Sequence, residues 1–295
     1  MSDPGWDYYR SFRAVLREGS LSAAARQLNL TQPTIGRHID ALEQALGVPL
    51  FIRSAHGLTP TKAARDLLPH AEAMASAAEA LQRAASADAE KDSGTVRVTA
   101  SEVVGVEVLP PILAVFRALH PRIDVELVVT NRTEDLSRHE ADIAVRMARP
   151  AQDALIAKRI GAVKLGLFAH RRYIDRHGVP KEWAELQQHD IIGFDRDPYN
   201  LRLARESGIT ATREIFALRT DSDLASLAAI RAGFGIGVCQ IPLGRRDNSL
   251  VQVLRGQLKL ELEMWLAMHE DLKSSLRVRL MFDHLSTALR DYVAD

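Results

Sequence analysis

Residues 20–53 read SLSAAARQLNLTQPTIGRHIDALEQALGVPLFIR, and this stretch decides the fold of the N-terminal part of the chain. Apolar residues recur at positions i, i+3, i+4 and i+7, the spacing of one face of a short helix. They are Leu21, Ala24, Ala25 and Leu28. Asn29 tolerates the left-handed conformation just past a helix end, Thr31 can cap a second helix, and Pro33 suits its first turn. The pattern predicts two helices joined by a tight turn.

The predicted second helix has an apolar face and a polar face. The apolar face consists of Ile35, Ile39, Leu42 and Leu46. The first turn and the polar face carry Gln32, Pro33, Thr34, Arg37, His38 and Ala41. This small, polar and uncluttered surface could enter a DNA major groove, which is about 12 Å wide. Residues 49–58 then predict a short strand and a hairpin. The alternative interpretation is an ordinary helical hairpin inside a bundle.

The same stretch, followed by GLTPTKAARDLL at residues 57–68, resembles the winged helix-turn-helix of LysR-type transcriptional regulators. The length and layout of the remainder fit the same family. The resemblance implies that the DNA contacts come from Gln32, Pro33, Thr34, Arg37 and His38, with Arg53 on a phosphate. One departure is Gly36, because the family usually carries a hydroxyl residue at this position. Glycine removes that hydrogen-bonding group and lowers helix stability by about 0.5–1 kcal/mol relative to alanine.

The overall charge does not indicate a nucleic-acid binder, because Lys and Arg total 38 and so do Asp and Glu. Between residues 8 and 65, however, the chain contains eight basic and three acidic residues, which gives a local net charge of +5. A local basic patch of this kind is what phosphate contact requires. The chain shows neither a signal-peptide pattern nor an apolar run of about 18 residues, so we expect a cytoplasmic protein. The single cysteine, Cys239 in GIGVCQIP, favours core packing over redox sensing.

Residues 62–87 predict a long helix that contains one proline, Pro69. Its apolar and small residues keep a seven-residue rhythm that two helices could share. They are Ala63, Leu67, His70, Met74, Ala78, Leu81 and Ala85. The resemblance implies a linker helix that pairs between subunits, giving a homodimer and, as a dimer of dimers, a homotetramer. The alternative is a helix that packs only on its own domain.

The polar stretch 88–94, DAEKDSG, predicts a hinge, and strands alternate with helices after it. This alternation indicates an α/β architecture. The apolar run 123–129 predicts a parallel strand buried on both faces. The resemblance implies an all-α winged helix-turn-helix domain at 1–60, the linker helix at 61–88 and a periplasmic-binding-protein-like effector domain at 89–295. That domain would consist of one subdomain at about 95–160 with 269–295 and a second at about 161–268.

Polar residues at strand ends and helix starts are the candidates for a small-molecule site, because unpaired backbone N–H groups face a crevice there. Ser101 and Glu102 follow one predicted strand, Thr130 follows the next, and Asp221 opens a later helix. The matching positions line the effector cleft in proteins that this chain resembles. Capping or a surface ion pair is the alternative role for each.

Two further residues complete the candidate effector set. Arg146 could clamp a carboxylate with two parallel hydrogen bonds, and Phe194 ends another predicted strand, 191–194. A small carboxylate is therefore the expected effector. Because Glu102, Asp195 and Asp221 could instead attract an ammonium group, an amino acid or zwitterion stays open.

No catalytic constellation can be assembled from the sequence. The glycines at 233, 235 and 237 lie after a predicted helix and before a strand, the wrong order for dinucleotide binding. The ten histidines show no metal-ligand spacing, so neither a cofactor nor a metal is expected. The expected function is promoter binding modulated by a small effector. The alternative is a cytosolic small-molecule-binding protein or enzyme with a helical dimerisation module, which would leave the wing and the polar helix face unexplained.

Overall fold

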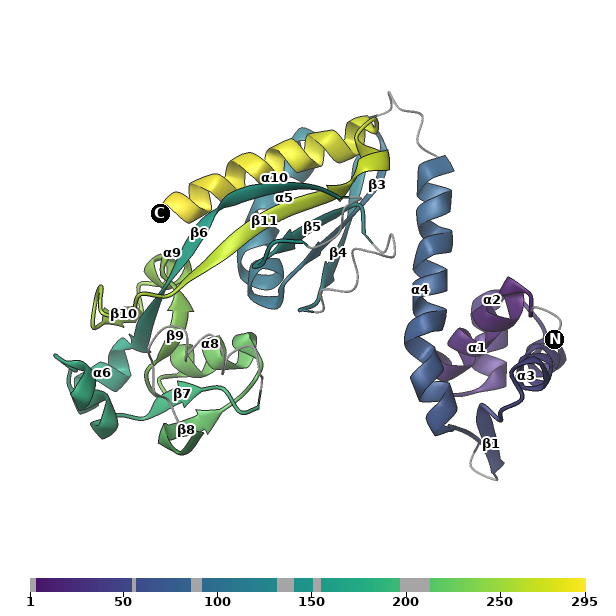
Figure 1. Cartoon of the computed structure of the whole chain (residues 1–295), viewed down its shortest axis with the longest axis horizontal. Coiled ribbons are helices and arrows are strands. Elements are labelled where there is room, and N and C mark those ends of the chain that lie inside the picture. Colours follow the sequence, from purple (N-terminus) through teal and green to yellow (C-terminus); the bar gives the residue numbers. More distant parts are fainter. Residues whose placement is uncertain (1–3, 55–56, 86–91, 132–140, 151–154, 197–212) are drawn as a thin grey trace. The chain divides into compact units, whose positions relative to one another are not determined.

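The computed structural model describes residues 4–54, 57–85, 92–131, 141–150, 155–196 and 213–295. These residues divide into two compact units. The first ends with the long helix at Ala85, and the second begins at Asp92. Figure 1 shows the first unit in purple and blue and the second in teal, green and yellow.

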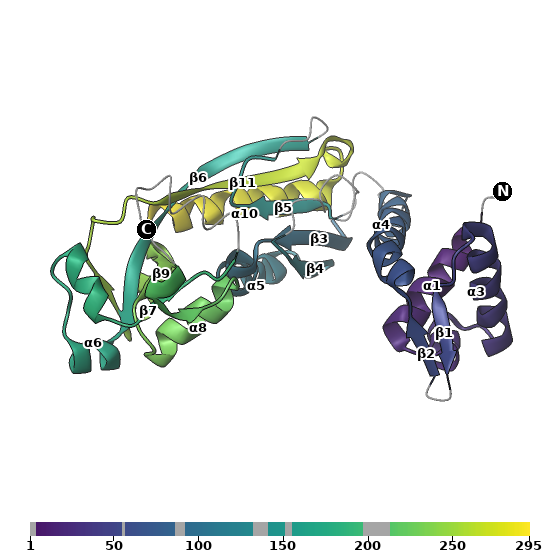
Figure 2. The ribbon, with the colours of Figure 1, turned by 60° about the horizontal axis from the view of Figure 1, so that its bottom comes forward.

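The first unit is a three-helix head followed by a two-stranded wing and a long helix. Its elements are α1 (Trp6–Glu18), α2 (Leu21–Leu28), α3 (Gln32–Leu46), β1 (Phe51–Ser54), β2 (Gly57–Pro60) and α4 (Lys62–Ala85). The three helices and the start of the wing meet in one apolar core, formed by Phe12, Val15, Ala24, Ile35, Ile39, Leu42, Leu50 and Phe51. Figure 2 shows the wing strands beside α1. The predicted helix-turn-helix and hairpin are therefore confirmed.

Local hydrogen bonds explain why the helices begin and end where they do. The Ser20 side chain accepts the Ala23 N–H at the start of α2, and Asn29 ends that helix with a φ of 54°. Thr31 accepts the Thr34 N–H at the start of α3. Each cap satisfies a backbone group that the helix leaves unpaired.

The first half of α4 packs on its own unit. Ala64 and Ala71 are buried in the head core, Leu67 packs against it, and Glu72 forms an ion pair with Arg17 of α1 at 3.1 Å. Further along, Leu81 is 72% exposed. Of the stripe predicted for pairing, Leu67 thus packs within the unit whereas Leu81 is uncovered.

The second unit contains one mixed sheet with the strand order β10-β6-β11-β5-β3-β4, and β9 also pairs with β6. Strands β3, β4 and β5 are parallel, whereas β11 runs antiparallel to both β5 and β6. The strands are β3 (Gly94–Ala100), β4 (Ile123–Val129), β5 (Ile143–Arg146), β6 (Leu155–His170), β9 (Gly237–Gln240), β10 (Leu250–Val253) and β11 (Glu261–His269). A separate parallel pair is formed by β7 (Ile191–Gly193) and β8 (Phe216–Arg219).

Helices and short turns connect these strands. The helices are α5 (Leu109–Leu119), α6 (Arg171–His177), α8 (Asp223–Ala232), α9 (Ile241–Arg246) and α10 (Leu276–Ala294). A π-helical turn, η1 (Val104–Val108), precedes α5. The 3-10 turns among the described residues include η3 (Trp183–Gln188), η4 (Arg213–Ile215) and η5 (Glu270–Leu272).

The expectation that strand 123–129 is buried on both faces is wrong. In the sheet order, β4 is the end strand. Its side chains are mostly solvent-accessible, and Leu127 and Val129 are 36% and 38% exposed. An apolar run has the same composition at an edge as in the middle of a sheet, so the sequence did not distinguish the two positions.

The second unit has separate hydrophobic cores, which define two lobes. Lobe A is built around residues 96–163 and 264–292, with Phe116, Ile143, Leu266 and Leu285 at its centre. Lobe B is built around residues 167–254, with Phe168 and Ile230 in one cluster and Tyr173 and Ile236 in the next. The long strand β6 contributes Val163 to lobe A and Leu167 to lobe B. Figures 1 and 2 both show β6 running from one lobe into the other.

Candidate DNA interface and effector site

The start of α3 presents the residues expected to read DNA. Gln32, Pro33 and Arg37 are exposed and Thr34 is half-buried. The Gln32 carboxamide oxygen accepts a hydrogen bond from the Ser22 hydroxyl at 3.1 Å, which ties α3 to α2. Within the part of the chain that the structure describes, Arg37 forms no hydrogen bond or ion pair, so its guanidinium extends from the helix unpaired.

His38 occupies a different environment from its neighbours. Its Nδ1 lies 2.8 Å from the Ser11 hydroxyl of α1, and its ring centroid is 5.0 Å from that of Tyr8. The imidazole is therefore half-buried and held between α1 and α3. This arrangement fixes how α3 sits on α1, a role that the sequence did not suggest.

Gly36 lies on the same helix with open space around it. A Cβ atom added at this position would have no atom within 4 Å beyond its own helix. Internal packing does not require glycine here.

A carboxylate near the end of α3 accepts two hydrogen bonds from the start of the wing. The backbone amides of Leu50 and Phe51 both donate to Glu43 Oε1, at 2.6 and 3.0 Å. In the hairpin the backbone of Arg53 pairs with Leu58. The Arg53 side chain, expected on a phosphate, lies outside what the structure describes.

In lobe A, the strand ends bring three candidate effector residues together. The Thr130 N–H donates to the Ala100 carbonyl at 2.9 Å, so β3 and β4 end side by side. The Glu102 N–H donates to the Asn131 side chain at 3.0 Å. The Ser101 hydroxyl is buried and has no hydrogen-bond partner among the described residues. A buried, unsatisfied hydroxyl is unfavourable, so this group is available for a ligand or water.

Lobe B adds residues across from this strand end. Asp221 was expected to cap α8, but Ser222 is the N-cap and accepts the Ala225 N–H. Asp221 instead accepts hydrogen bonds from the backbone amides of Asp195 and Arg196. The expectation failed because TDSD offers adjacent capping residues, and sequence alone does not rank them.

The two lobes meet at Glu102 and Ser222. The Ser222 hydroxyl lies 3.5 Å from Glu102 Oε2. Phe194, in contrast, packs edge-on against Phe216 of its own lobe, with ring centroids 5.0 Å apart. The structure therefore places Glu102 directly at the junction of the lobes.

Arg146 is only 4% exposed. Its guanidinium donates to the Thr99 hydroxyl at 2.9 Å and to the Val145 carbonyl at 3.1 Å. These contacts hold the side chain along the sheet near the end of β5. A positive charge thus lies close to the strand ends, although two of its hydrogen bonds are made within the protein.

The structure also shows contacts between the lobes that the sequence did not suggest. Arg231 in the last turn of α8 forms a bidentate ion pair with Glu107 of η1. These residues are separated by 124 positions, and no local pattern connects them. Only the folded arrangement reveals the pair.

Neither a metal site nor a reactive thiol is found in the described ranges. No group of three His, Cys, Asp or Glu side chains is positioned to hold a metal ion there. Burial raises the pKa of the Cys239 thiol to about 12. A thiol with so high a pKa forms little of the reactive thiolate, in keeping with a packing role. Among the described helices, none combines the length and the hydropathy that a membrane span needs.

Two family models match the chain. Residues 6–65 match the model described as bacterial regulatory helix-turn-helix protein, lysR family. Residues 89–290 match the model of the LysR substrate binding domain. The two matches correspond to the head with its wing and to the two-lobed unit.

Curated relatives and solved structures agree with these matches. A probable transcriptional regulator, LtrA of Klebsiella pneumoniae, is 26% identical over 93% of this chain and 92% of its own. The transcriptional activator AaeR of Escherichia coli is 28% identical over 84% of this chain and 80% of its own. The structure of CrgA, a LysR-type regulator from Neisseria meningitidis, covers 96% of this chain and 98% of its own with a TM-score of 0.59 and 24% identity.

The fold is also that of CbnR, another LysR-family transcriptional regulator. Its full-length structure in complex with target DNA has a TM-score of 0.66 and 21% identity, and covers 96% of this chain and 99% of its own. The family matches carry the assignment, and these structures support the fold. The chain belongs to the LysR family of helix-turn-helix transcriptional regulators, and is a DNA-binding regulator with an effector-binding domain rather than an enzyme.

Proposed function

We propose that this regulator reads promoter DNA with Gln32, Pro33, Thr34, Arg37 and His38, with Arg53 on a phosphate, and that a small polar effector held between the lobes modulates this binding. The DNA part of the proposal is carried by the exposed, uncluttered surface of the recognition helix α3. The effector part is carried by the buried, unsatisfied hydroxyl of Ser101 near the lobe junction. Promoter binding would place the protein in the cytoplasm.

The DNA part of the proposal is supported by charge and by shape. The region from residue 8 to residue 65 has a net charge of +5. The unpaired guanidinium of Arg37 suits guanine, whose O6 and N7 accept two parallel hydrogen bonds. Gln32 can pair similarly with adenine, while Thr34 offers a methyl and a hydroxyl. His38 contributes through its Nε2, because its Nδ1 already faces Ser11.

The proposed domain plan has a head at residues 1–60, a linker helix at 61–88 and an effector domain at 89–295. The second half of α4 supports a role in pairing between subunits. A helix with uncovered apolar residues gains little stability until it is paired. We propose a homodimer held partly by α4, and a dimer of dimers as the DNA-bound form.

The proposed effector is a small carboxylate or an amino acid. Ser101 and Thr130 offer hydroxyls at the ends of β3 and β4, and Arg146 supplies a nearby positive charge. Glu102 and Asp221 would receive an ammonium group, so a zwitterion satisfies both ends of the site. Phe194 would pack against the apolar part of the molecule.

Binding to its own promoter region at several salt concentrations tests the DNA proposal. Phosphate contacts release counterions, so the logarithm of affinity should fall linearly with the logarithm of salt concentration. A fragment of unrelated sequence serves as the control. Equal affinity for both fragments would contradict sequence-specific reading.

A thermal-shift screen with organic acids, amino acids and amines tests the effector proposal. A ligand that binds only the folded state raises the melting temperature with concentration. We expect carboxylates or amino acids to raise the melting temperature. The single variants Ser101→Ala and Thr130→Val should each remove this response. Stabilisation by amines alone would contradict the carboxylate, and an unchanged response in both variants would contradict the site.

A further inference from the structure

A bidentate ion pair between the lobes lies at the far end of the helix that Ser222 caps. Arg231 Nη1 and Nη2 donate to Glu107 Oε1 and Oε2 at 2.7 and 2.8 Å. This geometry is bidentate, which makes it shorter and more directional than an ordinary surface pair. The two side chains are 36% and 21% exposed, so solvent screens them only partly.

Lobe B holds the arginine in position before it reaches across. Arg231 Nε lies 3.4 Å from Asp247 Oδ2. Asp247 in turn accepts hydrogen bonds from the backbone amide and the hydroxyl of Ser249, at 2.9 and 2.6 Å. Because the Asp247 carboxylate is held by Ser249, it holds the Arg231 guanidinium in a position directed towards lobe A. The guanidinium therefore loses little further conformational entropy when it pairs with Glu107.

The partner glutamate is presented by an irregular turn. Glu107 lies in η1, the π-helical turn Val104–Val108. π-helical turns are rare and often occur at functional sites. Glu102 lies just before this turn, so one short segment of lobe A carries both contacts. Helix α8 carries the matching pair, Ser222 at its N-cap and Arg231 in its last turn.

A different contact between the lobes joins α10 to β9. The buried Tyr292 hydroxyl of α10 donates to Gln240 Oε1 at 2.5 Å, and the Arg246 guanidinium lies 4.8 Å from the Tyr292 ring centre. Burial of both Tyr292 and Gln240 makes this contact costly to break. The Glu107–Arg231 pair can exchange its bonds for water more easily.

We propose that the Glu107–Arg231 ion pair is a latch that holds lobes A and B together in the effector-free protein, and that effector binding works against it. An effector inserted between Glu102 and Ser222 must separate the start of α8 from lobe A. The rigid helix carries that movement to Arg231. Breaking the ion pair therefore destabilises the joined arrangement and shifts the lobes towards the separated one. The inference rests on the proposed effector site only in the statement that effector binding opposes the ion pair.

Pulsed electron paramagnetic resonance on the full chain, without DNA or effector, measures the latch directly. Spin labels at Ala118→Cys in α5 and Asp175→Cys in α6 report one distance between the lobes, because both positions are exposed. Cys239→Ala removes the native thiol. Dilution with unlabelled protein removes distances between subunits. Figure 1 shows α5 and α6 in different lobes.

We expect the latched protein to give one main distance, and Glu107→Gln and Arg231→Gln each to add a second population. The double variant should show no more of this population than either single variant. The matched control is Arg159→Gln, which breaks an ion pair with Glu263 at 3.0 Å that lies within lobe A. It should leave the distribution unchanged.

Two outcomes would overturn the latch. One is an unchanged distance distribution in both single variants. The other is an additive effect in the double variant, which would show that the two side chains act independently. If a glutamine variant does not melt cooperatively, Arg231→Lys and Glu107→Asp repeat the comparison with the charges kept. Because neither promoter nor effector is present, failure here is distinguishable from failure of the proposed function.

Discussion

Glu43 near the end of α3 accepts the backbone N–H of Leu50 through Oε1 at 2.6 Å, and thereby joins the recognition helix to the wing. Leu50 itself is fully buried in the head core. The carboxylate therefore fixes the angle at which the wing leaves the helix. Any contact that the wing makes with DNA depends on this joint.

Glu43→Ala should lower both stability and promoter affinity. Loss of a charged acceptor leaves the amides of Leu50 and Phe51 unsatisfied, at a cost of about 1–3 kcal/mol. Urea unfolding and fluorescence anisotropy with promoter DNA measure the two effects. Gln44→Ala, at an exposed position on the same helix, is the control. Equal behaviour of the two variants would show that the joint has no energetic role.

Arg37→Ala should weaken specific promoter binding by about 1–3 kcal/mol, because a good contact to a base edge or phosphate contributes that much. Arg37→Lys separates the two cases. If the contact is bidentate to a base, lysine will not restore specificity, whereas a phosphate contact will tolerate it. Anisotropy titrations against promoter and unrelated DNA provide the measurement. An unchanged affinity in folded Arg37→Ala would remove this residue from the interface.

Gly36→Ala should stabilise α3, because a Cβ there meets open space. The expected gain of about 0.5–1 kcal/mol corresponds to amide hydrogen exchange in α3 that is slower by about two- to fivefold. Promoter affinity is measured on the same sample. If promoter affinity falls while the helix becomes more stable, the glycine is needed for α3 to approach the DNA closely. Faster exchange in α3 would contradict the packing argument.

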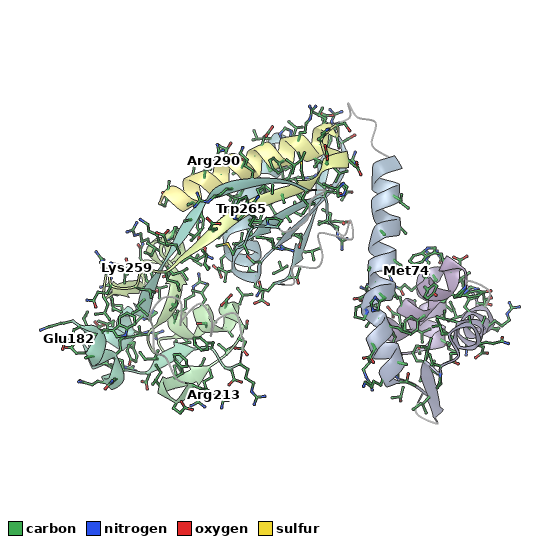
Figure 3. The ribbon with its side chains drawn as sticks, viewed as in Figure 1. Met74, Glu182, Arg213, Lys259, Trp265 and Arg290 are labelled. Atoms are coloured by element: carbon green, nitrogen blue, oxygen red, sulfur yellow. The ribbon has the colours of Figure 1, made fainter. Side chains whose placement is uncertain are left out.

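Met74→Glu should weaken subunit association. Met74 is 40% exposed on α4, where Figure 3 labels it, and a charge there opposes burial between two helices. Light scattering across a dilution series should show a shift towards monomer. Lys62→Glu, at the exposed start of the same helix, controls for the added charge. A variant that associates as tightly as the parent would place the interface away from this part of α4.

The latch should lose its contribution in acid. The hydrogen bonds from Arg231 hold the pKa of Glu107 below its ordinary value of 4.5, and Asp247 lies on the other side of the same guanidinium. The stabilisation by a carboxylate with a lowered pKa is complete above about pH 4.5, and disappears as pH falls through the folded-state pKa. The difference in urea midpoint between the parent and Glu107→Gln should therefore be full near neutral pH and shrink below pH 4.5. A constant difference would contradict this assignment.

The head was predictable from sequence because its determinants are local. Apolar spacing, Thr31 as a cap and Asn29 at a left-handed turn all act within a few residues of one another. The partners of His38 and Glu43 were not predictable, since both contacts depend on how separate elements pack. The choice of Ser222 over Asp221 as a cap also depends on where the neighbouring backbone lies.

The effector unit was predictable in class but not in detail. Alternating strands and helices indicated an α/β fold, and the structure places Ser101 and Thr130 at the adjacent ends of β3 and β4. The edge position of β4 and the pairing of Glu107 with Arg231 follow from the order of strands and the approach of two lobes. Neither property has a local sequence signal.

The path of the chain through the lobes also constrains the order in which they can be completed during synthesis. Lobe B is built from one continuous stretch, so it can close soon after residue 254 leaves the ribosome. Lobe A has its first strands made earlier, but its core requires Leu266 from β11 and Leu285 from α10. Until those residues emerge, apolar side chains of β3 and β5 lack the part of their core that β11 and α10 supply. The half-built sheet is therefore the point at which the nascent chain most needs protection from aggregation.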